Sequence, residues 1–454
     1  ASDPGMGTDN VAVGDQGRLE YWPLDRLLAE KPEAEVVMVD EAAAVPADLL
    51  KRILLGWPRV IYASTVHGYE GSGRGFAIRF RSVLDAETPH WRNTSLTAPI
   101  RWSASDPLEP LTRRMFLLDA QAPPVSDDEV NIAVERWNPG TAEDNELEEA
   151  FGLLVDAHYR TSPGDLRQWM DDPAAVSWRL TRGGVLVGVL WATVEGGLDS
   201  ELAEQVMLGK RRLRGHLLPQ SLATHSGFAK AACQSLLRIV RIAVSAEVRG
   251  EGLGQTLVAA ANDYACKQGL DGIGTSFGGN AGLLSFWQRC GLEPVRLGLK
   301  REASSGEYPL QLLAGVSAQG KALTDHLRGR LTEHWLTLVP RNWIDAEPEL
   351  ILRITCGLPA DRPLNENDFR DLHSFAHGYR GFDLALPVLR RLSLQAGVVN
   401  GMADERSRSL WARAVLQGWS WPELQANGEC VGREAGEAEL RSLVGDILQN
   451  RPDL

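Results

Sequence analysis

The central part of the chain shows a run of apolar, β-branched positions followed by a helical repeat. Residues 236–244 predict a buried strand, and a glycine-rich turn leads from it into a segment whose apolar residues recur every three or four positions. Leu253 and Leu257 therefore lie on one face of a predicted helix. A second strand at 272–277 and a second helix, which ends at Gly291, follow. The pattern predicts a strand–helix–strand–helix unit.

The residues before this unit predict the rest of one domain. A strand at 131–136 precedes helices at 143–159 and 165–170, and alternating residues at 177–194 indicate a hairpin whose turn contains Gly183. The order of strand, two helices, hairpin, strand, helix, strand and helix resembles that of GNAT acetyltransferases. We therefore expect their fold, a mixed sheet covered by helices.

Two further regions flank this domain. Residues 103–128 are rich in Pro, Ser and Asp and are typical of a linker. Residues 198–234 are basic, interrupted by Gly and Pro, and predict an insertion before the central strand. From about residue 320 onward the pattern is helical, and Asn365 three residues before Asp368 indicates a helix N-terminus.

The N-terminal region predicts a parallel α/β sheet of the nucleotide-binding kind. Residues 36–41 form an apolar run that ends in Asp40 and Glu41, and residues 59–65 form a second run that ends in hydroxyl side chains. Carboxylates at the end of such a strand can hold the shell of a Mg²⁺ ion and polarise the water that attacks a γ-phosphate. An exposed strand end is the structural alternative.

The glycine-rich turn after residue 244 carries the pattern R-x-x-G-x-G, formed by Arg249, Gly252 and Gly254. Its glycines let backbone amides approach a diphosphate at the positive end of a helix. GNAT acetyltransferases hold the diphosphate of coenzyme A in this way. A tight turn without a ligand is the alternative that this pattern leaves open.

Composition excludes several classes of protein. The 454 residues are enough for two or three domains, and 44% hydrophobic with 24% charged residues is typical of soluble globular proteins. We find no apolar run of the ~20 residues that a membrane span needs and no signal peptide, so we expect a cytoplasmic protein. The five cysteines are scattered and have no metal-ligand spacing, which argues against structural zinc and disulfides.

The charge is unevenly distributed. The net charge of −13 argues by itself against a nucleic-acid partner, because phosphate contacts need lysine and arginine. However, Lys210, Arg211, Arg212 and Arg214 form a dense basic block, and Lys300 with Arg301 forms a smaller one. Each is either a solvated face or an RNA contact.

Longer motifs give a more specific resemblance. The run at 275–308, TSFGGNAGLLSFWQRCGLEPVRLGLKREASSGEY, together with RIAV at 241–244 and PQSLATH at 219–225, resembles the tRNA(Met) cytidine acetyltransferase family. HGYEGSGRGF at 67–76 and PIRW at 99–102 resemble the ATPase module of the same family.

This resemblance implies a fold class and an activity. It implies an α/β multidomain chain with a partial P-loop helicase-like parallel sheet (1–120), a GNAT acetyltransferase domain (129–318) and a helical C-terminal tRNA-binding domain (319–454). The implied activity is transfer of acetyl from acetyl-CoA to the exocyclic N(4) amine of the wobble cytidine of elongator tRNA(Met), coupled in the family to ATP or GTP hydrolysis. No stable protein partner is implied.

The resemblance also assigns site residues. It implies that acetyl-CoA is bound by Ile242, Ala243, Val244, Arg249, Gly250, Glu251, Gly252, Leu253, Gly254, Gln255 and Arg289. It implies that ATP with Mg²⁺ is contacted by Asp40 and Glu41, as the Walker B pair, and by Arg101. Gly282 stands where the family often has a glutamate. Candidate RNA phosphate contacts are Arg380, Arg390 and Arg391.

One departure concerns ATP. The sequence contains no G-x-x-x-x-G-K-[ST], so the loop that would wrap the phosphates is missing. We expect either an N-terminally truncated enzyme or a natural form that has lost ATP hydrolysis, and the internal-looking first residue favours truncation.

The chemistry of acyl transfer suggests the remaining requirements. A backbone N–H near Ile242 to Val244 can stabilise the oxyanion, and tight positioning must help the weakly nucleophilic cytosine amine. His225, Glu302 and Tyr308 lie near the expected site, but none is assigned as general base, and no metal site is expected. The alternatives are an acetyltransferase for protein amines and an RNA-binding module without catalysis.

Overall fold

The structure is a computed structural model that describes most of the chain in two compact units, residues 1–107 and 108–454. The described residues are 11–14, 17–65, 80–81, 83–103, 105–125, 131–158, 161–302, 305–359, 363–399, 401–402 and 404–451.

The division between the two compact units falls after Pro107. The boundary of the first domain that we expect at residue 120 stays a prediction. Ala120 is buried with the apolar residues of the second unit, and a Cβ on Gly152 would lie 2.3 Å from the carbonyl carbon of Gln121. The segment around residue 120 therefore packs against the acetyltransferase region.

The first unit contains a small parallel sheet. β3 (Val37–Val39) pairs in parallel with β4 (Val60–Tyr62), as the sequence predicted, and α2 (Ala47–Gly56) connects them. Their apolar residues pack with Leu50, Ile53 and Phe80. The other described elements are an antiparallel hairpin of β1 (Val11–Gly14) and β2 (Gly17–Glu20), α1 (Leu24–Glu30) and the short turn η2 (Ala42–Ala44).

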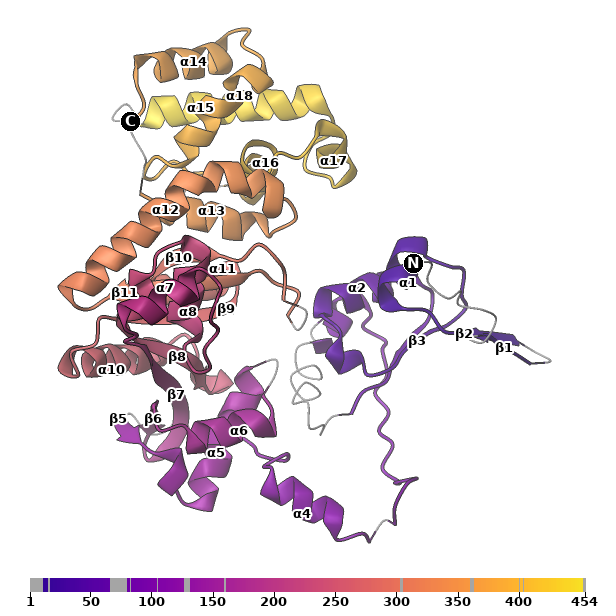
Figure 1. The fold of residues 1–454 in the computed structure, drawn as a ribbon. Coiled ribbons are helices and arrows are strands. Elements are labelled where there is room, and N and C mark those ends of the chain that lie inside the picture. Colours follow the sequence, from indigo (N-terminus) through magenta and orange to yellow (C-terminus); the bar gives the residue numbers. More distant parts are fainter. Residues whose placement is uncertain are drawn as a thin grey trace. The chain divides into compact units, whose positions relative to one another are not determined.

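The second unit is built on a seven-stranded sheet with the order β10-β11-β9-β8-β7-β6-β5 (Figure 1). Every neighbouring pair is antiparallel except β8 and β9, which are parallel. The strands are β5 (Ile132–Trp137), β6 (Ala175–Arg182), β7 (Val185–Gly196), β8 (Ser235–Val244), β9 (Gly272–Gly278), β10 (Glu293–Leu297) and β11 (Pro309–Gly315).

Helices cover both faces of this sheet because its central strands are apolar on both sides. β7 directs Val189 and Trp191 toward α5 (Asp144–Ala157) and α6 (Pro163–Asp171), whereas its Val187 and Leu190 pack with α10 (Leu253–Lys267). α11 (Ala281–Arg289) lies on the same face as α10 and ends before Gly291. The predicted order of strands and helices in this region is confirmed.

The insertion at 198–234 is helical. It contains α7 (Ser200–Met207), α8 (Leu217–Ser226) and α9 (Lys230–Cys233), which pack with Leu236 of β8 and Leu313 of β11. α8 crosses β9 closely, because a Cβ on Gly274 would lie 2.6 Å from a methyl carbon of Leu218. The insertion therefore covers one face of the sheet instead of projecting from it.

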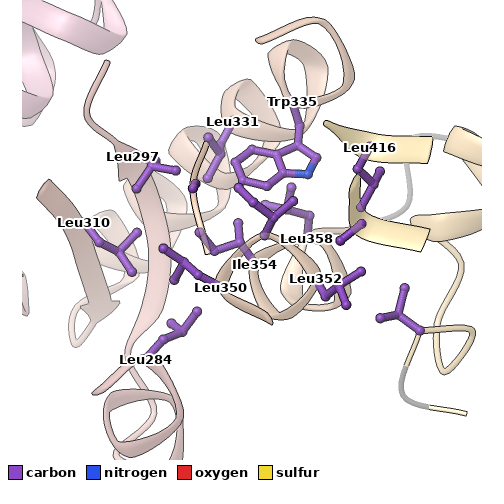
Figure 2. Close-up of a cluster of buried hydrophobic side chains, with 14 of the residues drawn as sticks. Leu284, Leu297, Leu310, Leu331, Trp335, Leu350, Leu352, Ile354, Leu358 and Leu416 are labelled. Atoms are coloured by element: carbon purple, nitrogen blue, oxygen red, sulfur yellow. The ribbon is translucent and has the colours of Figure 1, made fainter. Parts of the chain in front are cut away.

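The C-terminal region is helical, as predicted, and shares its core with the sheet. Figure 2 shows α13 (Pro348–Gly357) between leucines of α11, β10 and β11 on one side and Leu416 on the other. Because these side chains form one continuous cluster, the predicted domain 319–454 belongs to the same compact unit as the sheet.

The remaining helices of the second unit lie before, within and after the sheet region. The elements are α4 (Leu108–Met115), η3 (Pro139–Thr141), η4 (Ala246–Val248), α12 (Ala318–Asn342), α13 (Pro348–Gly357), α14 (Glu366–His377), α15 (Phe382–Ser393), α16 (Glu405–Trp411), η5 (Ala412–Leu416), α17 (Trp421–Ala426) and α18 (Arg433–Asn450). Asn365 and Asp368 form the predicted capping box at the start of α14.

Candidate active site

The two parallel strands in the middle of the sheet separate at their carboxyl ends. β8 and β9 pair from Leu236 and Gly272 as far as Ile239 and Thr275, and both strands then continue without pairing to each other. The pairing of β7 with β8 shifts register between Trp191 and Ala192, which leaves Val240 as an extra residue. Such a bulge bends its strand. A gap therefore opens between the carboxyl ends of these two strands.

Backbone amides on β8 face this gap. The amide of Ser245 donates to the Val187 carbonyl of β7 at 2.9 Å. Because hydrogen bonding alternates along an antiparallel pair, the amides of Ile242 and Val244 point away from β7 and toward the gap. Ala243 is buried against the α5 side. Two of the three strand residues predicted to contact the cofactor therefore offer N–H donors.

The glycine-rich turn continues from β8 into α10. Gly250 and Gly252 have φ values of +88° and +85°, which residues with a Cβ rarely adopt, and Gly252 is the N-cap of α10. Among the described residues, no side chain caps this helix N-terminus. The amides of Leu253, Gly254 and Gln255 have no intrahelical acceptor, and no described residue accepts from them. An anion such as a diphosphate fits these donors.

The side chains of the turn have distinct roles. The Arg249 Nε donates to the Val244 carbonyl at 3.0 Å, which fixes the base of the side chain while its terminal nitrogens have no acceptor among the described residues. Glu251 forms an ion pair with Arg182 of the β6–β7 hairpin at 3.1 Å. The Glu251 carboxylate thus ties the turn to the hairpin, and only its backbone amide is suited to a phosphate.

Helix α11 packs against the start of α10. A Cβ on Gly254 would lie 3.0 Å from Cε2 of Phe286, so a glycine is needed where the two helices approach. Arg289, one turn further along α11, is exposed at its carboxyl end, and Gly282 is exposed near its start. The structure therefore places the predicted cofactor residues around one end of the gap, and their roles stay predictions.

Tyr308 and Glu302, two of the three residues considered as general bases, do not have the surroundings of a general base. The Tyr308 hydroxyl donates to Asp345 at 2.6 Å, and burial together with that carboxylate raises the pKa of Tyr308. Glu302 is exposed and pairs its backbone with Glu307. His225 lies on α8, where partial burial and then the charge of Arg296 lower its pKa. A neutral imidazole at neutral pH is able to accept a proton.

A polar cluster beside His225 has no signal in the sequence. Gln311 of β11 is buried, and its amide nitrogen lies 3.0 Å from the Ser221 hydroxyl of α8. Arg296 of β10 lies 3.4 Å from the same hydroxyl. These residues come from three elements distant in sequence, so only the pairing of β10 with β11 under α8 reveals them.

The predicted ATP residues lie in the first unit. Asp40 and Glu41 follow β3, next to the end of β4, because the Ala42 amide donates to Ala63 at 2.9 Å. Both side chains are exposed, and Asp40 accepts from the Glu41 amide at 3.0 Å. Arg101 is also exposed, and within the described residues no hydrogen bond or ion pair joins it to these carboxylates. The motif at 67–76 lies outside the described residues.

The predicted tRNA contacts in the C-terminal helices have partners within the fold. Arg380 forms an ion pair with Asp371 at 2.9 Å, and Arg391 forms one with Asp368. Arg390 donates to the Val415 carbonyl at 2.8 Å, and burial lowers its pKa. These contacts lie within the helical region, and the role of the three arginines as RNA phosphate contacts stays a prediction.

The basic block between α7 and α8 is different. Lys210, Arg211, Arg212 and Arg214 are all exposed, and among the described residues none of the four forms an ion pair. Lys300 is also exposed, whereas Arg301 pairs with Asp345 at 3.1 Å. The first block keeps its charge available to an anionic ligand.

Other kinds of site are not found in the part of the chain that the structure describes. No group of His, Cys, Asp and Glu there is arranged to hold a metal ion, and the five cysteines are free. None of the helices described is long and apolar enough to cross a membrane.

The separated parallel strands, the glycine-rich turn and the uncapped N-terminus of α10 define the GNAT class of acetyltransferase fold. A family model agrees with this class, because residues 149–269 match "GNAT acetyltransferase 2". Residues 3–119 match a second model, "RNA cytidine acetyltransferase NAT10/TcmA, helicase domain". The chain belongs to the tRNA(Met) cytidine acetyltransferase family.

Individual relatives support this assignment along the whole chain. The tRNA(Met) cytidine acetyltransferase TmcA of Nitrosococcus halophilus is 39% identical over 441 residues, which cover 94% of this chain and 59% of the relative. The TmcA proteins of Vibrio cholerae and Haloarcula marismortui are 36% and 32% identical and cover 96% and 98% of this chain. The chain spans about three fifths of the length of these curated relatives.

Proposed function

We propose that this chain transfers acetyl from acetyl-CoA to the N(4) amine of the wobble cytidine of elongator tRNA(Met). The observation that carries the proposal is the gap between β8 and β9, which has amide donors along β8 and the free amides of α10 at its end. The names of the relatives indicate the RNA acceptor.

Binding of the cofactor follows from these donors. The diphosphate accepts hydrogen bonds from the amides of Leu253, Gly254 and Gln255, where the helix dipole adds to the attraction. Arg249 supplies a positive charge at the same end, and its anchored Nε limits the entropy lost on binding. Arg289 is a further cation on the neighbouring helix.

Acyl transfer then depends on orientation and charge. The thioester carbonyl oxygen gains negative charge as the amine attacks, and the amide of Ile242 or Val244 donates to that oxygen. The cytosine amine is a weak nucleophile because its lone pair is delocalised into the ring, so its fixed position contributes much of the acceleration. The sulfur leaves with the electron pair of the broken bond, and the amine loses its proton late in the reaction.

The role of ATP is a separate part of the proposal. In this chain Asp40, Glu41 and Arg101 would contribute to a nucleotide and Mg²⁺ site. The described residues do not supply a lysine and a glycine loop for the phosphates, and the sequence lacks that motif. We therefore expect acetyl transfer by this chain to be indifferent to added ATP.

Transfer of radiolabelled acetyl from acetyl-CoA to an unmodified elongator tRNA(Met) transcript tests the proposal. We expect label in the anticodon cytidine, and we expect this label to vanish in the variant Gly252→Glu. A glutamate is strained at the Gly252 φ of +85°, which distorts the turn, and its carboxylate repels the diphosphate. Gly329→Ala in α12 is the control and keeps activity, because a Cβ there would meet nothing within 4 Å. Label on protein amines but not on RNA would support the protein-acetylating alternative, and cofactor binding without any transfer would point to the non-catalytic alternative.

A further inference from the structure

A row of polar side chains runs from the mouth of the gap across the far half of the sheet. Ser276 of β9, the first residue beyond the pairing with β8, lies opposite Gln311 of β11, and Gln311 lies opposite Arg296 of β10. Residues directly opposite each other share a face of the sheet. Ser221 of α8 contacts Gln311 and Arg296, so this is the face that α8 covers.

Arg296 holds an uncompensated charge in this row. It is half-buried, its contact within the described residues is the Ser221 hydroxyl at 3.4 Å, and burial lowers its pKa without an acidic neighbour to oppose the effect. The acid on the same strand, Glu293, is directed to Arg328 at 3.6 Å. A partly desolvated guanidinium without a carboxylate gains strongly from an incoming anion.

The other arginines on this face are neutralised. Arg238 pairs with the buried Glu195 at 2.6 Å, and Arg241 pairs with Asp165 of α6 at 2.9 Å. Among the described residues, Arg296 is therefore an arginine of this face that no printed carboxylate neutralises. The exposed basic block at Lys210 to Arg214 precedes α8 and has the same sign.

We propose that Arg296, positioned by Ser221 and Gln311, binds a backbone phosphate of the RNA acceptor next to the reacting nucleotide and disfavours cationic amines. This inference rests on the proposed function, since it specifies the acceptor side of the same site. Guanidinium and phosphate pair through two parallel hydrogen bonds, and Ser221 offers a hydroxyl beside them. A lysine or polyamine acceptor approaching this end of the gap meets a like charge, which costs binding free energy.

The test is equilibrium binding of a fluorescently labelled elongator tRNA(Met) transcript at several salt concentrations. We expect Arg296→Gln to weaken binding about tenfold and to reduce the slope of log affinity against log salt by about one, because one phosphate contact is lost. Arg296→Lys keeps the charge but not the paired hydrogen bonds, so it keeps the slope and part of the affinity. Binding of acetyl-CoA by calorimetry stays unchanged in both variants.

Matched controls separate this role from a structural one. Arg330→Gln removes a cation from exposed α12, where Arg330 pairs with Glu333 at 2.5 Å, and leaves tRNA affinity unchanged. Wild-type affinity and slope in Arg296→Gln would overturn the inference. If Arg296→Gln does not fold, Arg296→Lys tests the inference instead. Folded Arg296→Lys must then show the wild-type slope of log affinity against log salt, and a changed slope would overturn the inference. Because binding is measured without transfer, a wild type that binds tRNA but does not acetylate it contradicts only the proposed function.

Discussion

Phe286 of α11 lies against Gly254 in the first turn of α10, and a Cβ on Gly254 would approach its ring to 3.0 Å. Gly254→Ala therefore displaces the ring or the helix start, at a cost of about 1–3 kcal/mol for overpacking. We expect weaker acetyl-CoA binding in calorimetry and a lower Tm. Gly329→Ala in α12 is the control, because a Cβ on this glycine would meet nothing within 4 Å. Equal cofactor affinity in both variants would contradict this role of Gly254.

The ion pair of Arg182 with Glu251 predicts that only the loss of its arginine weakens acetyl-CoA binding. Arg182→Gln leaves a carboxylate unbalanced beside the diphosphate site, so we expect acetyl-CoA affinity to fall about fivefold, equivalent to about 1 kcal/mol for this partly exposed pair. Glu251→Gln keeps the affinity, and the double variant restores most of it. Calorimetric titration at low and high salt measures the effect, which salt should reduce. An Arg182→Gln variant with wild-type affinity would show that Glu251 does not influence the cofactor.

The buried pair of Glu195 and Arg238 predicts a large loss of stability. The Glu195 side chain is fully buried, lies 2.6 Å from Arg238 and also accepts from the Leu218 amide at 2.9 Å. Glu195→Ala leaves a buried charge without its partner, which costs about 3–5 kcal/mol. Urea unfolding followed by tryptophan fluorescence gives this value. Glu333→Ala on exposed α12 is the control, at about 1 kcal/mol or less; equal effects would contradict the prediction.

His225 predicts a dependence of stability on pH. Partial burial and then Arg296 lower its pKa in the folded chain. Below about pH 6.5, the usual pKa of histidine, the unfolded chain binds a proton that the folded chain does not, so the free energy of unfolding falls until the folded pKa is reached. Arg296→Gln should raise the pKa of His225 and reduce this loss. NMR titration of the His225 ring measures the shift, and an unchanged pKa in Arg296→Gln would exclude the electrostatic cause.

The local elements of the sheet could be predicted from sequence because each depends on nearby residues. The apolar run before Arg249, the glycines at 250, 252 and 254 and the repeat of Leu253 with Leu257 are sufficient to indicate strand, turn and helix. The parallel pair in the first unit was predicted for the same reason. Hydrophobic periodicity reports which face of an element is buried, and glycines report where φ must be positive.

The sequence did not decide which charges are free. Arg390 and Arg391 resemble RNA contacts in a sequence, but helix packing gives them the Val415 carbonyl and Asp368 as partners. No sequence pattern marks Arg296 as an RNA contact. Strand pairing nevertheless places Arg296 beside Gln311 and Ser221, without a neighbouring carboxylate among the described residues. Family motifs and element order are thus determined by the sequence itself, whereas the availability of a charge depends on which distant residues the tertiary structure brings within a few ångströms, because electrostatic attraction and desolvation act through space.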